Sequence, residues 1–128
     1  MDKAQIGKAG EDFACRILEE KGYIIVERNY HSRYGEIDII AENGQALAFI
    51  EVKTRKQTGK TMPREAVDAR KQKKIILTAM LYLQQKPAKK TPRFDVFEVW
   101  HGENGIYKFS HLENAFDLSS LGGEYELF

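Results

Sequence analysis

Residues 35–53, GEIDIIAENGQALAFIEVK, constrain the fold of this 128-residue chain more than any other stretch. Residues 37–41 and 46–52 are rich in β-branched and aromatic side chains, which favour strands. Between them lies Asn43-Gly44, the strongest short-range sequence signal for a two-residue hairpin loop. The segment therefore predicts an antiparallel β-hairpin.

The predicted hairpin gathers charged side chains on one face. Because side chains alternate faces along a strand, this face carries Glu36, Asp38, Glu51 and Lys53. A two-residue loop places Asp38 opposite Phe49 and Glu36 opposite Glu51. A four-residue loop keeps all four charges on one face, whereas a three- or five-residue loop would move Asp38 to the other face.

The charged face is electrostatically costly. Its apolar neighbours Ile40, Leu47 and Phe49 indicate partial burial. Two carboxylates ~4 Å apart repel each other by ~1 kcal/mol in water and by ~4 kcal/mol at an effective dielectric constant of about 20. Such a cluster persists if a cation lies among the carboxylates or if one carboxyl group stays protonated. A ligand set made only of oxygen atoms favours Mg²⁺ or Mn²⁺ over zinc.

Length and composition indicate one soluble globular domain. No stretch approaches the ~20 apolar residues of a membrane span, and Cys15 is the only cysteine, so we expect a cytoplasmic protein without an internal disulfide. The net charge of +1 hides an asymmetry: residues 53–74 hold nine basic and two acidic residues, and residues 94–128 hold seven acidic residues and one lysine. A basic segment directly after an acidic cluster suits a phosphodiester substrate.

The remaining sequence predicts an α/β fold around a mixed sheet. Periodicity and capping signals predict helices over residues 3–21 and 63–85, and strands over residues 23–27, 93–100 and 106–110. The strand–helix–strand order after the hairpin implies a right-handed parallel crossover. Between the hairpin and the second helix, residues 54–63 are interpreted as a mobile basic loop.

Glu11 lies on or beside the apolar face of the first predicted helix. Taken alone, it is a boundary residue paired with a lysine, or a third carboxylate for the hairpin site. Glu51 and Lys53 also have two interpretations. They are part of a catalytic metal site or an ordinary cross-strand ion pair, because the E-x-K pattern alone is a weak signal.

The motifs GEIDIIA and FIEVKTR, followed by AVDARKQKKI and RFDVFEV, closely resemble the YraN family of small bacterial proteins over the stretch from Ile6 to about Phe116. That family is similar to the PD-(D/E)XK, restriction-endonuclease-like nucleases, and the hairpin is similar to that of archaeal Holliday-junction resolvases. The resemblance implies an α-β-β-β-α-β core with a mixed sheet flanked by helices. It implies a single nuclease-like domain over residues 1–118, followed by an acidic tail over residues 119–128.

The resemblance also implies roles for individual residues. Asp38 and Glu51 match the acidic residues of the motif, Lys53 its lysine, and Glu11 the first-helix glutamate of resolvase-like members. Asp38, Glu51 and Glu11 would hold Mg²⁺ or Mn²⁺, and Ile37 stands where the motif has proline. The nucleic-acid-binding candidates are Arg55, Lys56, Arg70, Lys71, Gln72 and Lys74, of which Gln72 matches a helical glutamine or lysine of some branches.

The leading hypothesis is therefore a metal-dependent nuclease acting on DNA, including branched or damaged DNA. One alternative is a nucleic-acid-binding module that keeps the nuclease fold without cleaving. Another is an interaction protein whose acidic C-terminal half recruits a partner in DNA processing. The sequence leaves open DNA or RNA, endonuclease or exonuclease, and a homodimer of the kind that junction-cleaving relatives form. No membrane partner is expected.

Overall fold

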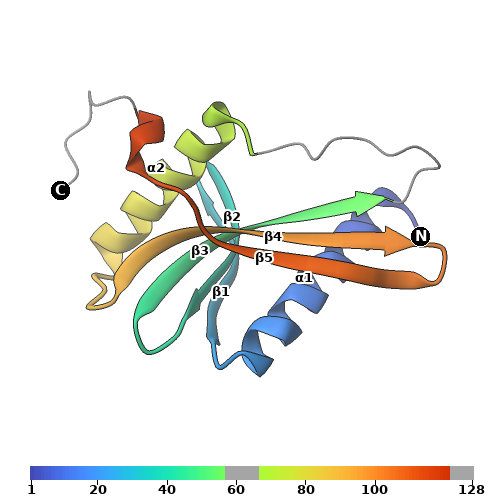
Figure 1. The fold of residues 1–128 in the computed structure, drawn as a ribbon. Coiled ribbons are helices and arrows are strands. Elements are labelled where there is room, and N and C mark those ends of the chain that lie inside the picture. Colours follow the sequence, from blue (N-terminus) through green and yellow to red (C-terminus); the bar gives the residue numbers. More distant parts are fainter. Residues whose placement is uncertain (57–66, 122–128) are drawn as a thin grey trace.

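The computed structural model describes residues 1–56 and 67–121 (Figure 1). The predicted helices and strands are all present in this part of the chain, with longer strands than expected. In chain order the elements are α1 (Lys3–Glu20), β1 (Ile24–Ser32), β2 (Gly35–Glu42), β3 (Ala46–Lys56), α2 (Ala69–Gln85), β4 (Thr91–Gly102), β5 (Gly105–Phe116) and the 3-10 helix η1 (Leu118–Leu121). None of the helices among these residues is long and apolar enough to cross a membrane.

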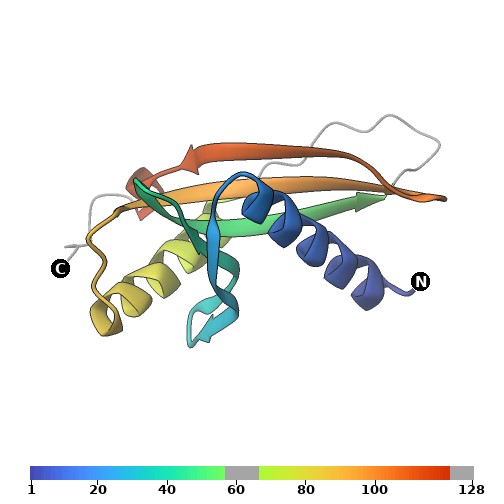
Figure 2. The same cartoon turned by 90° about the horizontal axis from the view of Figure 1, so that it is seen from below.

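The five strands form one mixed sheet in the order β1-β2-β3-β4-β5. All neighbouring pairs are antiparallel except β3 and β4, which are parallel and connected through α2. The predicted mixed α/β fold with a parallel crossover is therefore confirmed. Figures 1 and 2 show that β3, β4 and β5 extend well beyond the start of α2.

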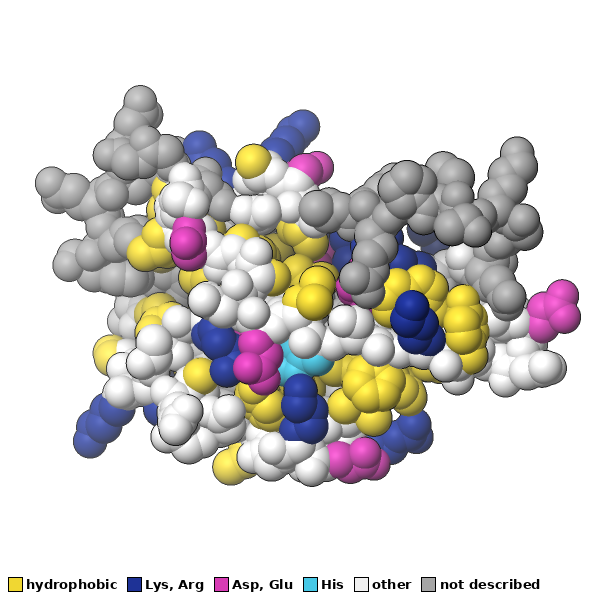
Figure 3. All heavy atoms as spheres, in the orientation of Figure 1, with side chains coloured by type: hydrophobic (Ala, Val, Ile, Leu, Met, Phe, Trp, Pro, Cys, Tyr) yellow, Lys and Arg dark blue, Asp and Glu magenta, His cyan; other side chains and the backbone are white. Residues whose placement is uncertain are grey.

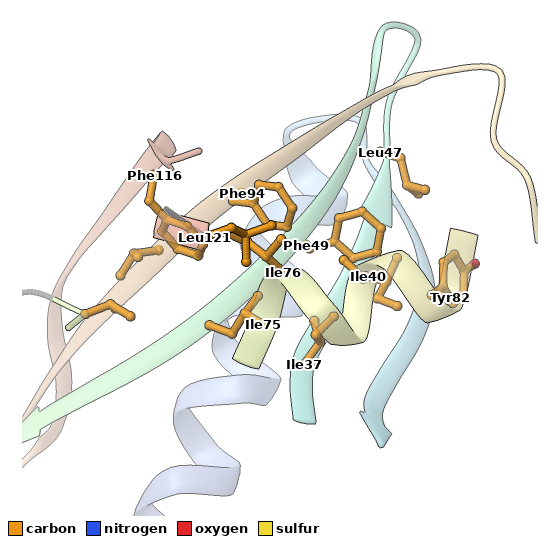
Figure 4. Packing of buried hydrophobic residues seen from close by; sticks show 13 residues of the cluster. Ile37, Ile40, Leu47, Phe49, Ile75, Ile76, Tyr82, Phe94, Phe116 and Leu121 are labelled. Carbon is orange, nitrogen blue, oxygen red and sulfur yellow. The ribbon is translucent and has the colours of Figure 1, made fainter. Parts of the chain in front are cut away.

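The two helices cover opposite faces of the sheet because strand residues alternate. On one face, Ala14 and Leu18 of α1 pack with Ile39 and Ile50. The opposite face is larger and is covered by α2, as Figure 4 shows. Its core consists of Ile37, Ile40, Leu47, Phe49, Val67, Ile75, Ile76, Ala79, Tyr82, Phe94, Val96, Phe116 and Leu121.

Helix α1 begins and ends where the sequence predicts. Asp2 and Gln5 form a reciprocal capping box, with 2.8 Å between each backbone nitrogen and the side-chain oxygen of the other residue. Gly22, with φ +94°, follows the C-cap and takes the left-handed conformation that glycine favours. These caps fix the helix to Lys3–Glu20, within one residue of the predicted span.

Helix α2 starts later than predicted. Asp68 has an extended backbone (φ −71°, ψ 165°), and its carboxylate accepts a hydrogen bond of 2.8 Å from the Lys71 backbone nitrogen. Asp68 is therefore the N-cap, and the helix begins at Ala69 rather than at residue 63. Pro63, on which the earlier start rested, lies outside the described residues, as do residues 57–63 of the predicted basic loop. Residues 54–56 of that loop belong to β3.

Four residues, 43–46, lie between the innermost paired residues of the hairpin, rather than two, although the last of them already belongs to β3. Glu42 pairs with Leu47 and Ile40 with Phe49, so the predicted pairing of Asp38 with Phe49 is wrong by two residues. The cause is the Asn43 side chain, whose oxygen accepts hydrogen bonds from the backbone nitrogens of residues 45 and 46 at 2.9 and 2.8 Å. This wider turn is the four-residue alternative, and it keeps Asp38 and Glu51 together.

At the C-terminal end, η1 packs against α2 and places Leu121 in the core, with 7% of its surface exposed. The first residues of the predicted acidic tail therefore belong to the folded unit. The rest of the tail, residues 122–128, lies outside the described residues.

Candidate functional site

Asp38 and Glu51 lie where β2 and β3 stop pairing. The last paired residues of this ladder are Ile39 and Ile50. One residue further along, Asp38 Oδ2 accepts a hydrogen bond of 2.7 Å from the Val52 backbone nitrogen. Ile37 and Ile40 both lie in the core on the α2 side, so strict alternation in β2 ends near Asp38. The Asp38 carboxylate consequently points toward β3 and bridges the two strands.

The two carboxyl groups meet at this point and hydrogen-bond each other. Glu51 is only 6% exposed. Burial, followed by the charge of Asp38, raises the pKa of Glu51 to about 7. Burial is also the main reason why the pKa of Asp38 is raised. At neutral pH the pair therefore tends to share a proton, and a cation would relieve the repulsion between the ionised groups.

This pair should make the protein less stable as the pH rises from about 4.5 through 7. In that window the folded chain keeps a proton on Glu51 that the unfolded chain has released, so the free energy of unfolding falls. A rise of the Glu51 pKa from 4.5 to about 7 corresponds to a decrease of roughly 3 kcal/mol in the free energy of unfolding. The decrease is complete above pH 7. Urea denaturation in EDTA at pH 5 and pH 8 measures it. Glu51→Gln should remove most of this decline, and an equal decline in both proteins would contradict the assignment.

A lysine from α2 lies beside the pair. Lys71 Nζ is 3.5 Å from Glu51 Oε1, and the charge of Lys71 lowers the pKa of both carboxyl groups against the effect of burial. The Asp68 cap holds the backbone of Lys71 in the first turn of α2. Lys71, predicted as a nucleic-acid contact, is thus the counter-ion of Glu51 in this structure.

Glu11 approaches the same carboxylates from α1. Burial, followed by the charge of Asp38, raises the pKa of Glu11. The helix can come this close because Gly10 leaves room for Thr54 of β3, where a Cβ atom would collide with the Thr54 hydroxyl. Asn29 donates a side-chain hydrogen bond to Glu11, and Arg28 lies 3.9 Å from it.

Asn29 is a site residue that the sequence analysis missed. Its backbone is in the left-handed region, with φ +52°, which is uncommon for residues other than glycine. An available signal was an asparagine inside an otherwise β-forming stretch, because asparagine is depleted in strands and tolerates positive φ.

The other predicted residues have three kinds of surroundings. Arg55 binds Glu98 of β4, with its Nε 2.9 Å and Nη2 2.8 Å from Oε2, and Gln72 donates a hydrogen bond of 2.7 Å to the Val67 carbonyl oxygen. These two side chains have structural partners. Lys53 follows Glu51 by two residues and is half-buried. The exposed candidates are Lys56, Arg70 and Lys74.

A divalent cation fits Asp38 and Glu51, although the predicted set of three carboxylates is not assembled. Among residues 1–56 and 67–121, no group of three or more His, Cys, Asp or Glu side chains is arranged to hold a metal. Magnesium needs no such group, because it commonly binds one or two carboxylates and completes its shell with water and substrate phosphate. The buried Glu51 and the partly buried Asp38, whose carboxyl groups meet and both have raised pKa values, are a suitable donor set for it.

Comparison with known proteins identifies the family. Residues 10–99 match the family described as "Uncharacterised protein family UPF0102". A UPF0102 protein of Dictyoglomus thermophilum is 46% identical over 118 residues, which cover 91% of this chain and 100% of the relative. A UPF0102 protein of Persephonella marina is 45% identical over 113 residues, covering 88% and 93%. The resemblance found in the sequence is confirmed at this level, and the chain belongs to the UPF0102 (YraN) family.

Proposed function

We propose that this protein is a metal-dependent nuclease of the PD-(D/E)XK type that hydrolyses phosphodiester bonds in DNA. The observation that carries the proposal is the contact between the partly buried Asp38 and the buried Glu51 at the point where β2 and β3 separate. Shielding two carboxyl groups in contact from water destabilises a fold. Titratable groups with strongly shifted pKa values cluster at functional sites. Lys71, 3.5 Å from Glu51, suits an anionic substrate.

Each residue of the site has a chemical task in this proposal. Asp38 and Glu51 would hold Mg²⁺ or Mn²⁺, which supplies Lewis-acid activation of the phosphate and of water when bound. Lys53, two residues after Glu51 in β3, would stabilise the negative charge that grows on the phosphate oxygens. Glu11 contributes a further negative charge on the α1 side of the site.

Phosphate contacts would come from exposed cations around the start of α2 and the end of β3. Arg70 and Lys74 are exposed on the first turns of α2, and Lys56 is exposed at the end of β3. Lys and Arg side chains project from the upper edge of the molecule in Figure 3, near the start of α2 in Figure 1. Contacts of this kind position a backbone without reading its sequence.

The test is cleavage of labelled linear, flapped and four-way-junction DNA with Mg²⁺ or Mn²⁺, with EDTA as the metal-free control. We expect cleavage that EDTA abolishes, and the preferred substrate would define the class of DNA. If no substrate is cut with either metal while salt-dependent DNA binding persists, the protein is a binding module and the nuclease proposal is wrong.

A further inference from the structure

A hollow between α1 and β1 adjoins the carboxylate site. It has a volume of about 630 Å³ and is lined by Ala4, Gly7, Lys8, Glu11, Arg28 and Asn29. Figure 2 shows that α1 and β1 diverge from the turn that connects them. The volume lies within the range of small-ligand sites in proteins, roughly 300–1,000 Å³.

The hollow is lined by Gly7, a helical glycine that packing does not explain. A Cβ atom at Gly7 would meet nothing within 4 Å, whereas one at Gly10, a turn later, would collide with Thr54. A glycine inside a helix costs about 0.5–1 kcal/mol relative to alanine. Gly10 is required by the close approach of α1 to β3. Gly7 has no such packing role, and its effect is to keep this part of the hollow clear.

The β1 wall of the hollow lies next to Asp38. Arg28 of β1 pairs with Ile39 and Tyr30 pairs with Ile37, so Asn29 stands beside Asp38 of the neighbouring strand. Glu11, whose pKa is raised by burial and then by the charge of Asp38, forms part of the α1 wall. Asn29, which hydrogen-bonds Glu11, lines the same hollow. A group bound in the hollow would therefore lie next to the proposed reaction centre.

The lining favours an uncharged polar group over a phosphate. Arg28 Nη2 lies 2.8 Å from Asp12 Oδ1, and Lys8 Nζ lies 3.1 Å from Asp12 Oδ2, so one aspartate partly neutralises both cations. Glu11 adds a negative charge to the wall. The amide of Asn29 can donate and accept hydrogen bonds. Gly7 presents no side chain to the hollow, which leaves room there for a ring.

We propose that this hollow is a nucleoside subsite, which holds the sugar and base of the nucleotide next to the phosphate that is cut. The inference rests on the proposed nuclease function for the identity of the substrate. It assigns the α1–β1 side of the molecule to substrate positioning, in addition to the basic side chains around α2.

The test uses Gly7→Leu, which fills the hollow, and Gly44→Leu, which adds the same side chain in open space at the hairpin loop. Binding is measured by NMR titration of the metal-free protein with thymidine 5′-monophosphate, and with inorganic phosphate as a separate probe. We expect the nucleotide, but not phosphate, to shift the signals of Gly7 and Asn29. Gly7→Leu should weaken nucleotide binding and DNA cleavage by at least about tenfold, since misplacing a substrate near the chemistry has effects of this size. Gly44→Leu should change neither.

The outcomes separate this inference from the nuclease proposal. If the parent cleaves DNA and Gly7→Leu cleaves it equally well, the subsite is overturned while the nuclease stands. If the nucleotide shifts the hollow residues but no DNA is cut, the subsite stands and the nuclease proposal fails. Equal shifts from phosphate and from the nucleotide would overturn the nucleoside assignment.

Discussion

Asp38→Asn should lower the rate of DNA cleavage by about 10²–10³-fold, the usual cost of removing one group that stabilises charge in a reaction. Asparagine keeps an oxygen that can accept the hydrogen bond from the Val52 backbone nitrogen, so the junction between β2 and β3 should survive. What is lost is the negative charge next to Glu51. Single-turnover cleavage at saturating Mg²⁺ measures the effect, and calorimetric titration with Mn²⁺ should show weaker metal binding.

Asp117→Asn is the matched control for this variant. Asp117 also accepts a hydrogen bond from a backbone nitrogen, that of Ser119 at 2.9 Å, but it is exposed at the end of β5. The same chemical change there should leave cleavage and metal binding unaltered. If Asp38→Asn retains both the parental metal affinity and the parental rate, Asp38 is not part of the site.

The sequence predicts the hairpin well because two different loop lengths lead to the same result. A period of two places Asp38 and Glu51 together whether the loop has two or four residues, since a shift of two preserves the face. The actual register depends on the Asn43 side chain, which a dipeptide signal does not reveal. Similarly, Asp68 moves the start of α2 by its capping bond, although the helical pattern further along is unaffected.

The contacts around the carboxylates could not be predicted in this way, because they join elements distant in the chain. Lys71 was expected in a basic surface, yet the crossover places it 3.5 Å from Glu51. Arg55 was expected at the same surface but is held by Glu98. Glu11 was ambiguous in the sequence, and the close approach at Gly10 brings it under the influence of Asp38. The spacing of residues along one strand can be read from the sequence. The contacts between elements distant in the chain can be known only from the three-dimensional structure.

A second cluster, on β4 and β5, escaped the sequence analysis entirely. Asp95 is completely buried and accepts hydrogen bonds from the Arg93 guanidinium at 2.8 and 2.9 Å, from His111 Nε2 at 2.8 Å and from the Asn114 backbone nitrogen at 2.9 Å. Burial alone would raise the pKa of Asp95, but the hydrogen bonds from His111 and Arg93 outweigh it and lower the pKa. Each of the two Asp95 carboxylate oxygens accepts two hydrogen bonds, which explains why a charge can be buried there.

Asp95→Ala should lower the free energy of unfolding by about 3–5 kcal/mol, because it leaves Arg93 and His111 in a largely buried position without their shared partner. Urea denaturation at pH 7 measures the loss. Glu113→Ala is the matched control: Glu113 lies 3.9 Å from the same Arg93 but is half-exposed, so its removal should cost less than about 1 kcal/mol. Comparable losses of stability in the two variants would contradict the role of burial in making the Asp95 contacts stronger than that of Glu113.

A large loss for Asp95→Ala alone would establish that this network holds β4 to β5 and Tyr23, whose hydroxyl also accepts a hydrogen bond from Arg93. The cleavage rate of the folded Asp95→Ala protein should then equal that of the parent, since the hydrogen bonds of Asp95 all go to this network rather than to the Asp38–Glu51 pair.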